Sequence, residues 1–591
     1  MNDFIFGTLA TEELRRARVQ LLRGGVTHRV RRTPRDPRPG QSVLIELTAG
    51  PAHPGERAWV YWTTDGSDPA GNHGQPLAGF RTFSMPLEPS GVEWDNVLWG
   101  YIRAFRGNLP GQPAGTIVRY RLSLEEMGTG EVYADGGMYN AYCVDEDMVP
   151  AWARDAVIYQ VFVDRFDPGV GRNWKKPRKL SGFFGGRIEG ITKKLDYITE
   201  VGANTLWLSP IFPSPSHHGY DATDLFEIEP RLGTKADLKL LLDESHRRGL
   251  RVLLDFVPNH WSDLHPTFQD AIKNPASQYR NWYIFNHWPD KYESFFGVHS
   301  LPQVNLRDPG ARQYMLDAAR YWLEFGVDGY RLDYAIGPTL DFWADFRRVT
   351  RSVRQDCWTF GEIVDPPDVQ LSYEGLLDGA LDFMLLEAFR QTFAFGSWDG
   401  IRFAGFLDRH EAAFPDNFSR PSFLDNHDMN RFLWVAHGDK RRLKLAALCQ
   451  FTLRGAPIIY YGTEAGLSQQ RDIRQDMLGI PEEARLPMVW GSHVDRDLIS
   501  FYRDLIEFRK RNPISQGKRS TIAAETDWLA YRQDNEGQSF TVVLNLNSSS
   551  EKVLPFDGGE LQLASDQNCC ISRNKHRFSL TLPPLSGAIL V

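Results

Sequence analysis

The strongest constraint on the fold is a regular alternation of apolar runs with amphipathic segments between residues 156 and 464. Each run is long enough for one buried strand, whereas the segments between them, such as 235–249 and 310–326, carry apolar residues at helical spacing. Strands that alternate with helices favour a parallel sheet, and eight of them predict a (β/α)8 TIM barrel of the α/β class. The predicted strands are 156–163, 204–212, 250–257, 327–334, 357–364, 379–385, 421–427 and 456–464.

Residues 1–150 lack this alternation and predict a separate N-terminal β-sandwich domain. A polar segment with helical spacing comes first, at 11–22. Short stretches of alternating polar and apolar residues follow it, separated by the Gly, Pro and Asp residues that favour turns. The clearest predicted strands are 58–64, 97–105 and 116–124.

Short alternating strands return in residues 515–591 and predict a C-terminal β-sandwich domain. The predicted barrel domain therefore spans 151–514. Its longest interval between strands, 260–308, is rich in Trp, Tyr, Phe, His and Pro. We expect this interval to form a short excursion over the barrel mouth after the third strand.

Composition argues against several classes of protein. The formal net charge of -8 disfavours a nucleic-acid partner, because binding a polyanion requires a cationic surface. No apolar run reaches the ~18 residues needed to span a membrane, and the N-terminus lacks the pattern of a signal peptide, so a cytoplasmic protein is expected. The 5 cysteines have no metal-ligand spacing and predict neither a disulfide framework nor a zinc site.

Charged and polar side chains gather where the predicted strands end. The carboxyl ends of barrel strands meet at one rim, where the chemistry of such barrels takes place, so we interpret the set as functional. The residues are Asp255, Asn259 and His260 after the third strand, Arg331 and Asp333 on the fourth, Glu362 after the fifth, and Asp425, His427 and Asp428 after the seventh.

Arg331 and Asp333 lie two positions apart on a predicted strand and therefore project to the same face. A buried carboxylate requires a partner, and Arg331 is a candidate that would keep Asp333 ionised near neutral pH. Taken alone, the pair fits two interpretations equally well: an activated nucleophile, or a structural buried salt bridge.

Carboxyl groups at one barrel mouth, without a nucleophile elbow, a Gly-rich phosphate loop or zinc spacing, favour glycoside hydrolysis. Two carboxyl groups about 5–5.5 Å apart suffice for the retaining reaction, in which one attacks the anomeric carbon and the other acts as acid and then as base. Asp333 has its arginine and is expected to be ionised. Glu362 lies in an apolar run, which is expected to raise its pKa and suits an acid.

Four motifs, in order, resemble those of glycoside hydrolase family 13, the α-amylase family. They are DFVPNH at 255–260, GYRLDYA at 329–335, GEI at 361–363 and FLDNHD at 423–428, and three accessory motifs match at GANTLWLSPIF, LPQVN and YYGTEAG. The resemblance covers residues 150–591 and implies a retaining hydrolase of α-glucosidic bonds.

Carried over residue by residue, the resemblance implies that Asp333 is the nucleophile, Glu362 the acid/base and Asp428 a third carboxylate that hydrogen-bonds sugar hydroxyls. It also implies four residues that bind the sugar at the cleavage point or orient the nucleophile. These are Tyr220 in SHHGYDATD by stacking, His260 and His427 through sugar hydroxyls, and Arg331 beside Asp333.

Within the family, the chain resembles the cyclomaltodextrinase, neopullulanase and maltogenic amylase group, because a predicted β-sandwich precedes the barrel and the excursion is short. The resemblance implies cyclodextrins, maltooligosaccharides or related α-glucans as substrates, some transglycosylation, and a homodimer formed through the N-terminal domain. The chain departs from the usual pattern of this group at LPQVN, at Ile336 and Gly337, and at Val364, where a tryptophan is usual.

Several alternatives stay open. The same barrel suits a general α-amylase or an α-glucan transglycosylase or isomerase, whereas a non-catalytic glucan-binding protein is disfavoured because all three carboxylates are present. The N-terminal domain fits a carbohydrate-binding module as well as a dimerisation arm. Family members often bind Ca2+ through an asparagine matching Asn259 or a loop after the first strand. Here that loop, FDPGVGRNWKKPRK, offers few oxygen ligands, so no metal is expected to be required.

Overall fold

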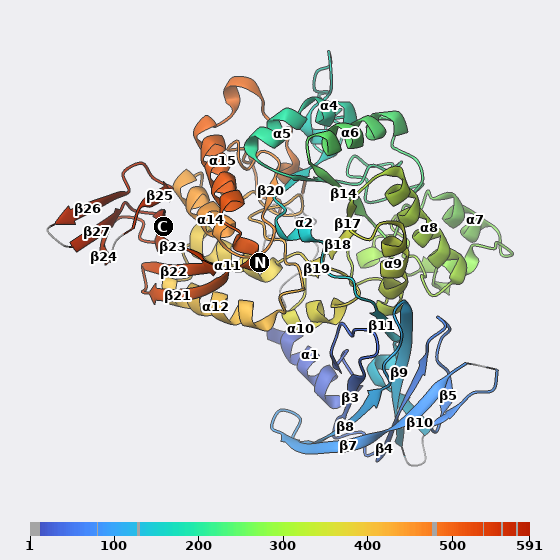
Figure 1. The fold of residues 1–591 in the computed structure, drawn as a ribbon. Helices are drawn as coiled ribbons and strands as arrows, with labels where there is room; N and C mark the ends of the chain where they lie inside the picture. Colours follow the sequence, from blue (N-terminus) through green and yellow to red (C-terminus); the bar gives the residue numbers. More distant parts are fainter. Residues whose placement is uncertain are drawn as a thin grey trace.

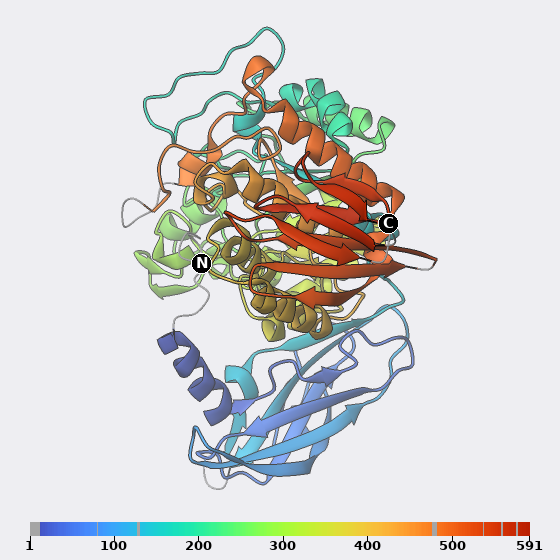
Figure 2. The ribbon, with the colours of Figure 1, turned by 90° about the vertical axis from the view of Figure 1, so that its left-hand side faces the viewer.

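The computed structural model describes residues 12–591 except 80, 127–129, 475–480, 536, 557–558 and 575–576. A central region of parallel strands and helices is flanked by two regions of antiparallel sheet, the N-terminal one in blue and the C-terminal one in red (Figure 1). The view turned by 90° (Figure 2) shows the N-terminal sheet projecting from the central region. Among the described residues, no helix is both long enough and apolar enough to cross a membrane.

The N-terminal region contains a nine-stranded sheet in the order β1-β3-β8-β7-β4-β9-β10, with β2 paired to β3 and β11 paired to β9. The long strand β7 pairs with β4 before Pro89 and with β8 around and after it, across a bulge that lets the sheet bend. Apolar side chains such as Ile45, Val60 and Phe105 form a core of their own inside the bend.

The elements of this region follow the sequence prediction closely. Helix α1 covers the predicted helix apart from residue 11, which lies outside the described residues, and β8 begins at Gly100 because Asp95 holds a turn before it. The bounds are α1 Glu12–Gly24, β1 Val26–Thr27, β2 Arg32–Thr33, β3 Val43–Ala49, β4 Arg57–Thr63, β5 Gly71–Asn72, β6 Gln75–Pro76, β7 Phe83–Asp95, β8 Gly100–Leu109, β9 Thr116–Glu126, β10 Gly130–Tyr133 and β11 Asn140–Val144.

The central region contains seven parallel strands in the order β19-β18-β17-β14-β13-β12-β20. The segment 419–422 joins the two edges of this sheet, because Ser419 bridges Gly379 of β19 and Ser422 bridges Pro457 beside β20, both in the parallel sense. This arrangement is consistent with the predicted barrel. The strands are β12 Ile158–Val161, β13 Thr205–Leu208, β14 Arg251–Phe256, β17 Gly329–Leu332, β18 Trp358–Gly361, β19 Gly379–Ala380 and β20 Ile458–Tyr460.

Two predicted strands are wrong in part. The run 379–385 gives only the short strand β19, because the Asp382 carboxylate accepts a hydrogen bond from the Leu385 amide and caps helix α11 (Phe383–Phe389). The run 421–427 has the isolated bridge from Ser422 to Pro457 in place of a regular ladder. Its Asp425 carboxylate accepts a hydrogen bond from the Phe432 amide at 2.8 Å and so belongs to the turn that follows.

Helices connect the parallel strands, and side-chain caps set the starts of several of them, including α6 and α8. Thr234 and Asp237 form a capping box at α6, and the Asp308 carboxylate accepts from two amides at the start of α8. Both helices match their predicted segments. The helices are α2 Ala151–Arg154, α3 Val163–Phe166, α4 Ile188–Lys193, α5 Leu195–Val201, α6 Lys235–Arg247, α7 Pro266–Lys273, α8 Pro309–Phe325, α9 Leu340–Val353, α10 Pro367–Gln370, α11 Phe383–Phe389, α12 Gly400–Ala413, α13 Phe432–Val435, α14 Lys440–Thr452 and α15 Arg496–Arg511.

The predicted excursion 260–308 is a compact aromatic unit between β14 and β17. It contains α7 and the short hairpin β15 (Phe285–His287) and β16 (Lys291–Tyr292). The ring of Phe268 lies 4.8 Å from those of both Tyr283 and Tyr292, which ties the helix to the hairpin. The bridge between His260 and Gln303 returns the excursion to the end of β14.

The C-terminal region contains a five-stranded sheet in the order β21-β22-β23-β28-β25 and a three-stranded sheet in the order β24-β27-β26. Buried side chains of both sheets, among them Val543, Leu580 and Ala588, share one core. The strands are β21 Lys518–Ala524, β22 Trp528–Asn535, β23 Gln538–Asn545, β24 Lys552–Phe556, β25 Leu561–Ala564, β26 Cys570–Asn574, β27 Arg577–Leu582 and β28 Ser586–Leu590. All five cysteines of the chain are free.

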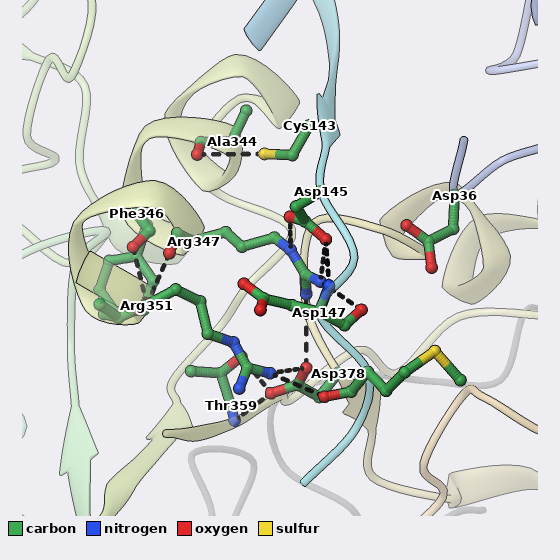
Figure 3. A network of polar contacts seen from close by, with 12 residues as sticks. Asp36, Cys143, Asp145, Asp147, Ala344, Phe346, Arg347, Arg351, Thr359 and Asp378 are labelled. Carbon is green, nitrogen blue, oxygen red and sulfur yellow. Dashed lines mark hydrogen bonds and ion pairs between the residues drawn. The ribbon is translucent and has the colours of Figure 1, made fainter. Parts of the chain in front are cut away.

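A buried polar network fastens the end of the N-terminal sheet to the central region (Figure 3). Arg347 of α9 donates to the two carboxylate oxygens of Asp145, just beyond β11, at 2.8 and 3.0 Å. Arg347 and Arg351 both pair with Asp378, at 3.4 and 2.5 Å. Asp378 also accepts from the Thr359 amide of β18 at 2.9 Å. The network therefore couples the segment just beyond β11 to the parallel strand β18.

We expect Arg347→Leu to lower the free energy of unfolding by about 3–5 kcal/mol, because the buried Asp145 and Asp378 carboxylates lose the positive charge of Arg347. Arg348→Leu is the matched control on the same helix, since the Arg348 side chain is 54% exposed and its one ion pair with a described residue is to Asp345. Thermal unfolding followed by calorimetry should show a clear drop in midpoint for the first variant alone. Equal midpoints for the two variants would show that the network does not fasten the regions together.

Candidate active site

The centre of the candidate site is Arg331, a fully buried side chain on β17. Its Nη1 donates to Asp255 Oδ1 at 2.7 Å and to Asp333 Oδ1 at 2.8 Å. Its Nη2 lies 2.8 Å from Glu362 Oε1, an ion-pair contact without the geometry of a hydrogen bond. One guanidinium therefore contacts three carboxylates that come from three neighbouring strands.

Backbone pairing places two of these carboxylates at the strand ends. The Asp333 amide donates to the Phe256 carbonyl at 2.9 Å, and the Glu362 amide donates to the Leu332 carbonyl at 2.8 Å. The ladders of β14, β17 and β18 thus continue one step beyond the regular strands. Because parallel strands share a direction, their ends deliver Asp333 and Glu362 to the same rim of the sheet.

Burial dominates the ionisation of this pair. It raises the pKa of Asp333 to about 7 and that of Glu362 to about 7, and in both cases Arg331 opposes the rise. The predicted rise in the pKa of Glu362 is confirmed. The prediction that Arg331 keeps Asp333 ionised near neutral pH is wrong in part: the guanidinium lowers the pKa, but burial outweighs it, and a pKa of about 7 leaves Asp333 only partly ionised there. Near neutral pH the two groups together hold about one proton.

The third predicted carboxylate, Asp428, has an arginine and a histidine beside it that are separate from Arg331. Arg485 Nη2 donates to Asp428 Oδ1 at 2.8 Å, and His427 Nε2 lies 2.8 Å from Asp428 Oδ2. Burial acts to raise the pKa of Asp428, but His427 and Arg485 together hold it below its ordinary value. Asp428 is therefore ionised at neutral pH, unlike the pair beside Arg331.

Tyr220 connects these two groups of charges. Its hydroxyl donates to Asp255 Oδ2 at 2.9 Å and lies 2.7 Å from His427 Nε2. The Tyr220 and His427 rings are nearly parallel, with an interplanar angle of 6°. Burial raises the pKa of Asp255 to about 6, and the Trp207 indole donates to the same Asp255 carboxylate at 3.2 Å. Gln160 holds the other ring nitrogen of His427 at 3.0 Å.

His260 enters the site from the start of the excursion. Its ring stacks on Phe295 with centroids 4.3 Å apart, and the two rings are inclined by 23°. Burial lowers the pKa of His260 to about 3, so the imidazole is neutral at physiological pH. A neutral imidazole can both donate and accept, which suits contacts with sugar hydroxyls.

At the two places where members of the resembled family often bind Ca2+, the side chains make contacts within the chain. Asn259 Oδ1 already accepts from Gln303 at 3.1 Å, and a Cβ at Gly337 would lie only 2.0 Å from it. Asp167, in the loop after β12, accepts from the Gly169 amide at 2.9 Å. In the part of the chain that the structure describes, no group of three or more His, Cys, Asp or Glu side chains could hold a metal ion.

The structure brings the predicted residues together at one end of the parallel sheet, namely Tyr220, His260, Arg331, Asp333, Glu362, His427 and Asp428. Asp425, also on the predicted rim, accepts a hydrogen bond from the backbone of the next turn. Sequence reasoning missed Gln160 and Arg485. Gln160 is a polar residue inside an apolar strand, a signal that could have been used, whereas Arg485 ends an isolated 3-10 turn and carries no such signal.

We expect the stability gap between Glu362→Gln and the parent protein to depend on pH. The folded-state pKa of Glu362 is raised from 4.5 to about 7, so between these values the folded parent binds more protons than the unfolded chain and loses stability as pH rises. Glutamine does not titrate. Between about pH 5 and pH 8, the free energy of unfolding of the variant should rise by about 2–3 kcal/mol relative to that of the parent, at about 1.4 kcal/mol per pKa unit. Denaturant titrations check this, and a gap independent of pH would contradict it.

Comparisons with known proteins agree with this geometry. A family model described as "Alpha amylase, catalytic domain" matches residues 160–538, more than half of the chain. Alpha-amylase 2 of Dictyoglomus thermophilum is 38% identical over 512 residues, which cover 86% of this chain and 87% of the relative. Neopullulanase 2 of Thermoactinomyces vulgaris is 34% identical over 477 residues, which cover 75% of this chain and 78% of the relative.

Two solved structures are similar to this chain over three quarters or more of its length. A cyclomaltodextrinase superposes with a TM-score of 0.69 at 25% identity and covers 96% of this chain and 99% of its own. The cyclic α-maltosyl-(1→6)-maltose hydrolase from Arthrobacter globiformis has a TM-score of 0.66 at 29% identity and covers 75% of this chain and 99% of its own. With the family motifs assembled around Arg331, the chain belongs to the α-amylase family, glycoside hydrolase family 13.

Proposed function

We propose that the protein is a retaining hydrolase of α-1,4-glucosidic bonds in cyclodextrins, maltooligosaccharides and related α-glucans. The observation that carries the proposal is the contact of one buried guanidinium, Arg331, with both Asp333 and Glu362. Two carboxyl groups on one guanidinium lie close together, as the retaining reaction requires of its nucleophile and its acid.

In the first step, an oxygen of ionised Asp333 attacks the anomeric carbon of the bound sugar. Glu362 gives its proton to the glycosidic oxygen, the bond to that oxygen breaks, and the shortened glucan leaves as an alcohol. In the second step, Glu362 takes a proton from water while the water oxygen attacks the same carbon. The ester bond to Asp333 breaks, and both carboxyl groups return to their starting states.

The ionisation of the pair supports these roles. Because both pKa values are raised to about 7, the pair holds about one proton near neutral pH, as one nucleophile and one acid require. The strong hydrogen bond from Arg331 favours the ionised form at Asp333. Glu362 has an ion-pair contact with Arg331 and a hydrogen bond from the uncharged Tyr334 amide, and it keeps the proton.

The groups around the pair supply binding. Asp428, ionised beside Arg485, would accept hydrogen bonds from sugar hydroxyls that strengthen as charge develops in the ring. His260 and His427 are further hydroxyl partners, and Tyr220 offers a half-buried ring for stacking. Such contacts hold the anomeric carbon at Asp333.

The relatives support the class of substrate. The similar proteins include enzymes named neopullulanase and cyclomaltodextrinase, and one named α-amylase shares 38% identity. The last of these favours a general α-amylase as a second candidate. Transfer of the glycosyl group to a sugar instead of water belongs to the same proposal, because a sugar hydroxyl can take the place of water in the second step.

The finer architecture is also part of this proposal. An eight-stranded barrel at 151–514 would lie between β-sandwich domains at 1–150 and 515–591, and the N-terminal domain would form a homodimer or bind glucan. The antiparallel sheets on either side of the parallel sheet, and the coverage of 96% of this chain by a cyclomaltodextrinase structure, support this arrangement of domains.

We expect Asp333→Asn to lower kcat on maltooligosaccharides by about 10⁴, because an amide cannot form the covalent intermediate. Proton NMR of the parent reaction should show the α-anomer of the product before mutarotation, as double displacement requires. A β-anomer formed first, or a variant with activity near that of the parent, would contradict the proposed mechanism.

We expect the initial rate of reducing-sugar release to be higher on cyclodextrin than on soluble starch or pullulan at equal mass, with products resolved by chromatography. The reason is the similarity to cyclomaltodextrinases over most of the chain. Faster attack on starch, with cyclodextrin untouched, would instead support the general α-amylase.

A further inference from the structure

A glutamine lies inside the apolar strand β12 and contacts the candidate site from the core. Gln160 is 1% exposed, and its Nε2 lies 3.0 Å from His427 Nδ1. Its neighbours in the strand, Tyr159 and Val161, belong to the hydrophobic core. Among the described residues, the Gln160 Oε1 atom has no hydrogen-bond partner. Because an unpaired buried acceptor is costly, the donor of this amide explains its presence better than the acceptor does.

The other ring nitrogen of His427 faces two acceptors. His427 Nε2 lies 2.8 Å from Asp428 Oδ2 and 2.7 Å from the Tyr220 hydroxyl oxygen. The Tyr220 hydroxyl gives its own proton to Asp255 Oδ2 at 2.9 Å, so its oxygen presents a lone pair to Nε2. A bare Nε2 would set its lone pair against those of both oxygens, whereas a protonated Nε2 can donate. The proton of the imidazole therefore lies on Nε2.

A neutral imidazole carries one proton on nitrogen, so its second nitrogen must accept. Burial has the largest effect on His427 and lowers its pKa, although Asp428 acts to raise it. His427 is therefore neutral at neutral pH, and its Nδ1 accepts from the Gln160 amide. Three hydrogen bonds then run in one direction, from Gln160 through His427 and Tyr220 to Asp255.

We infer that Gln160 is a positioning residue that sets the direction of this chain by donating to Nδ1, which keeps His427 neutral and its proton on Nε2. The donor occupies the lone pair at which a second proton would bind. The reverse chain, in which Nδ1–H donates to Gln160 Oε1, would need a bare Nε2 beside the Asp428 carboxylate. For catalysis the inference rests on the proposed function, whereas the tautomer of His427 does not depend on it.

The charge of His427 matters because ionisable groups from several elements surround it. A second proton on His427 would place a positive charge near the acid, and a cation there lowers the pKa of Glu362. The neutral imidazole therefore helps Glu362 to keep the proton that the first step needs. The groups that face His427 are Asp428 next in sequence, Arg485 from the turn 481–485, Arg331 from β17 and Tyr220 from the segment after β13.

The test begins with NMR of the full-length protein, labelled with 15N in its histidine side chains and free of substrate. Couplings between the ring nitrogens and the carbon-bound ring protons distinguish the Nε2–H tautomer, the Nδ1–H tautomer and the imidazolium. The signals that vanish in His427→Gln identify His427. We expect the Nε2–H tautomer at neutral pH, and either an Nδ1–H tautomer or an imidazolium there would overturn the inference.

Two substitutions of Gln160 then change the group that faces Nδ1. Gln160→Met keeps the length of the side chain and removes the donor, so the pH midpoint at which His427 becomes an imidazolium should rise by about one pH unit, a tenfold change in the binding of that proton. Gln160→Glu replaces the donor by an acceptor and should raise the midpoint further. Equal midpoints in the parent and in Gln160→Met would overturn the inference.

Gln533→Met is the matched control. Gln533 is 2% exposed, its Nε2 donates to the Thr452 carbonyl at 2.9 Å, and its Oε1 likewise has no hydrogen-bond partner within the described part of the chain. It lies on β22 of the C-terminal sheet, so the control removes an equivalent buried amide outside the site. The titration of His427 should be the same as in the parent. If Gln160→Met does not fold, the tautomer in the parent spectrum still decides the inference.

Kinetics on maltotetraose test the catalytic consequence. The kcat/KM of Gln160→Met should fall relative to the parent, and the loss should grow from neutral to acid pH, because a larger fraction of His427 is then an imidazolium. A loss that is the same at every pH would show a structural role alone and would overturn the positioning role. A parent protein that hydrolyses no maltooligosaccharide would instead overturn the proposed function, while the tautomer of His427 would still stand or fall by its NMR signals.

Discussion

The Arg331 guanidinium is fully buried and lies within 2.8 Å of Asp255, Asp333 and Glu362. One positive charge cannot compensate three buried negative charges, so protons stay on the cluster, and burial raises all three pKa values. Asp428 accepts a hydrogen bond from a second arginine, Arg485, and is ionised. Three carboxyl groups share Arg331, whereas Asp428 contacts Arg485. The three groups around Arg331 therefore retain protons and Asp428 does not, before any substrate binds.

An unevenly compensated cluster of this kind is costly and needs a rigid support. The backbone pairing of β14, β17 and β18 supplies part of it, and the network of Arg347 and Asp378 fixes the opposite end of the neighbouring strands. The N-terminal region contributes as well, because Arg18 of α1 donates to Asp365 at 3.0 Å, three residues after Glu362. The loop that carries the acid thus contacts a region that sequence analysis assigned to a separate domain.

Sequence predicted the parts of the site that lie at regular strand ends, because period and direction determine where such side chains meet. Arg331, Asp333 and Glu362 were found in this way. It failed where a side chain decides the local structure. Asp382 caps a helix inside an apolar run that was predicted to be a strand throughout, and Arg485 reaches Asp428 from a turn without periodicity. The raised pKa of Asp333 was missed because its burial, and the carboxylates of Asp255 and Asp428 close to it, are visible only in three dimensions.

The same distinction separates the parts of the site that strand pairing holds from the parts that loops carry. Strand ends are held by ladders, so the distances around Arg331 tolerate little change, and the chemistry depends on them. Phe296 belongs to the excursion and Tyr334 to the turn after β17, where loops can vary without disturbing the sheet. The Tyr334 amide, which donates to Glu362, joins the two parts. Through that bond, a change in the turn after β17 also acts on the carboxyl group of Glu362.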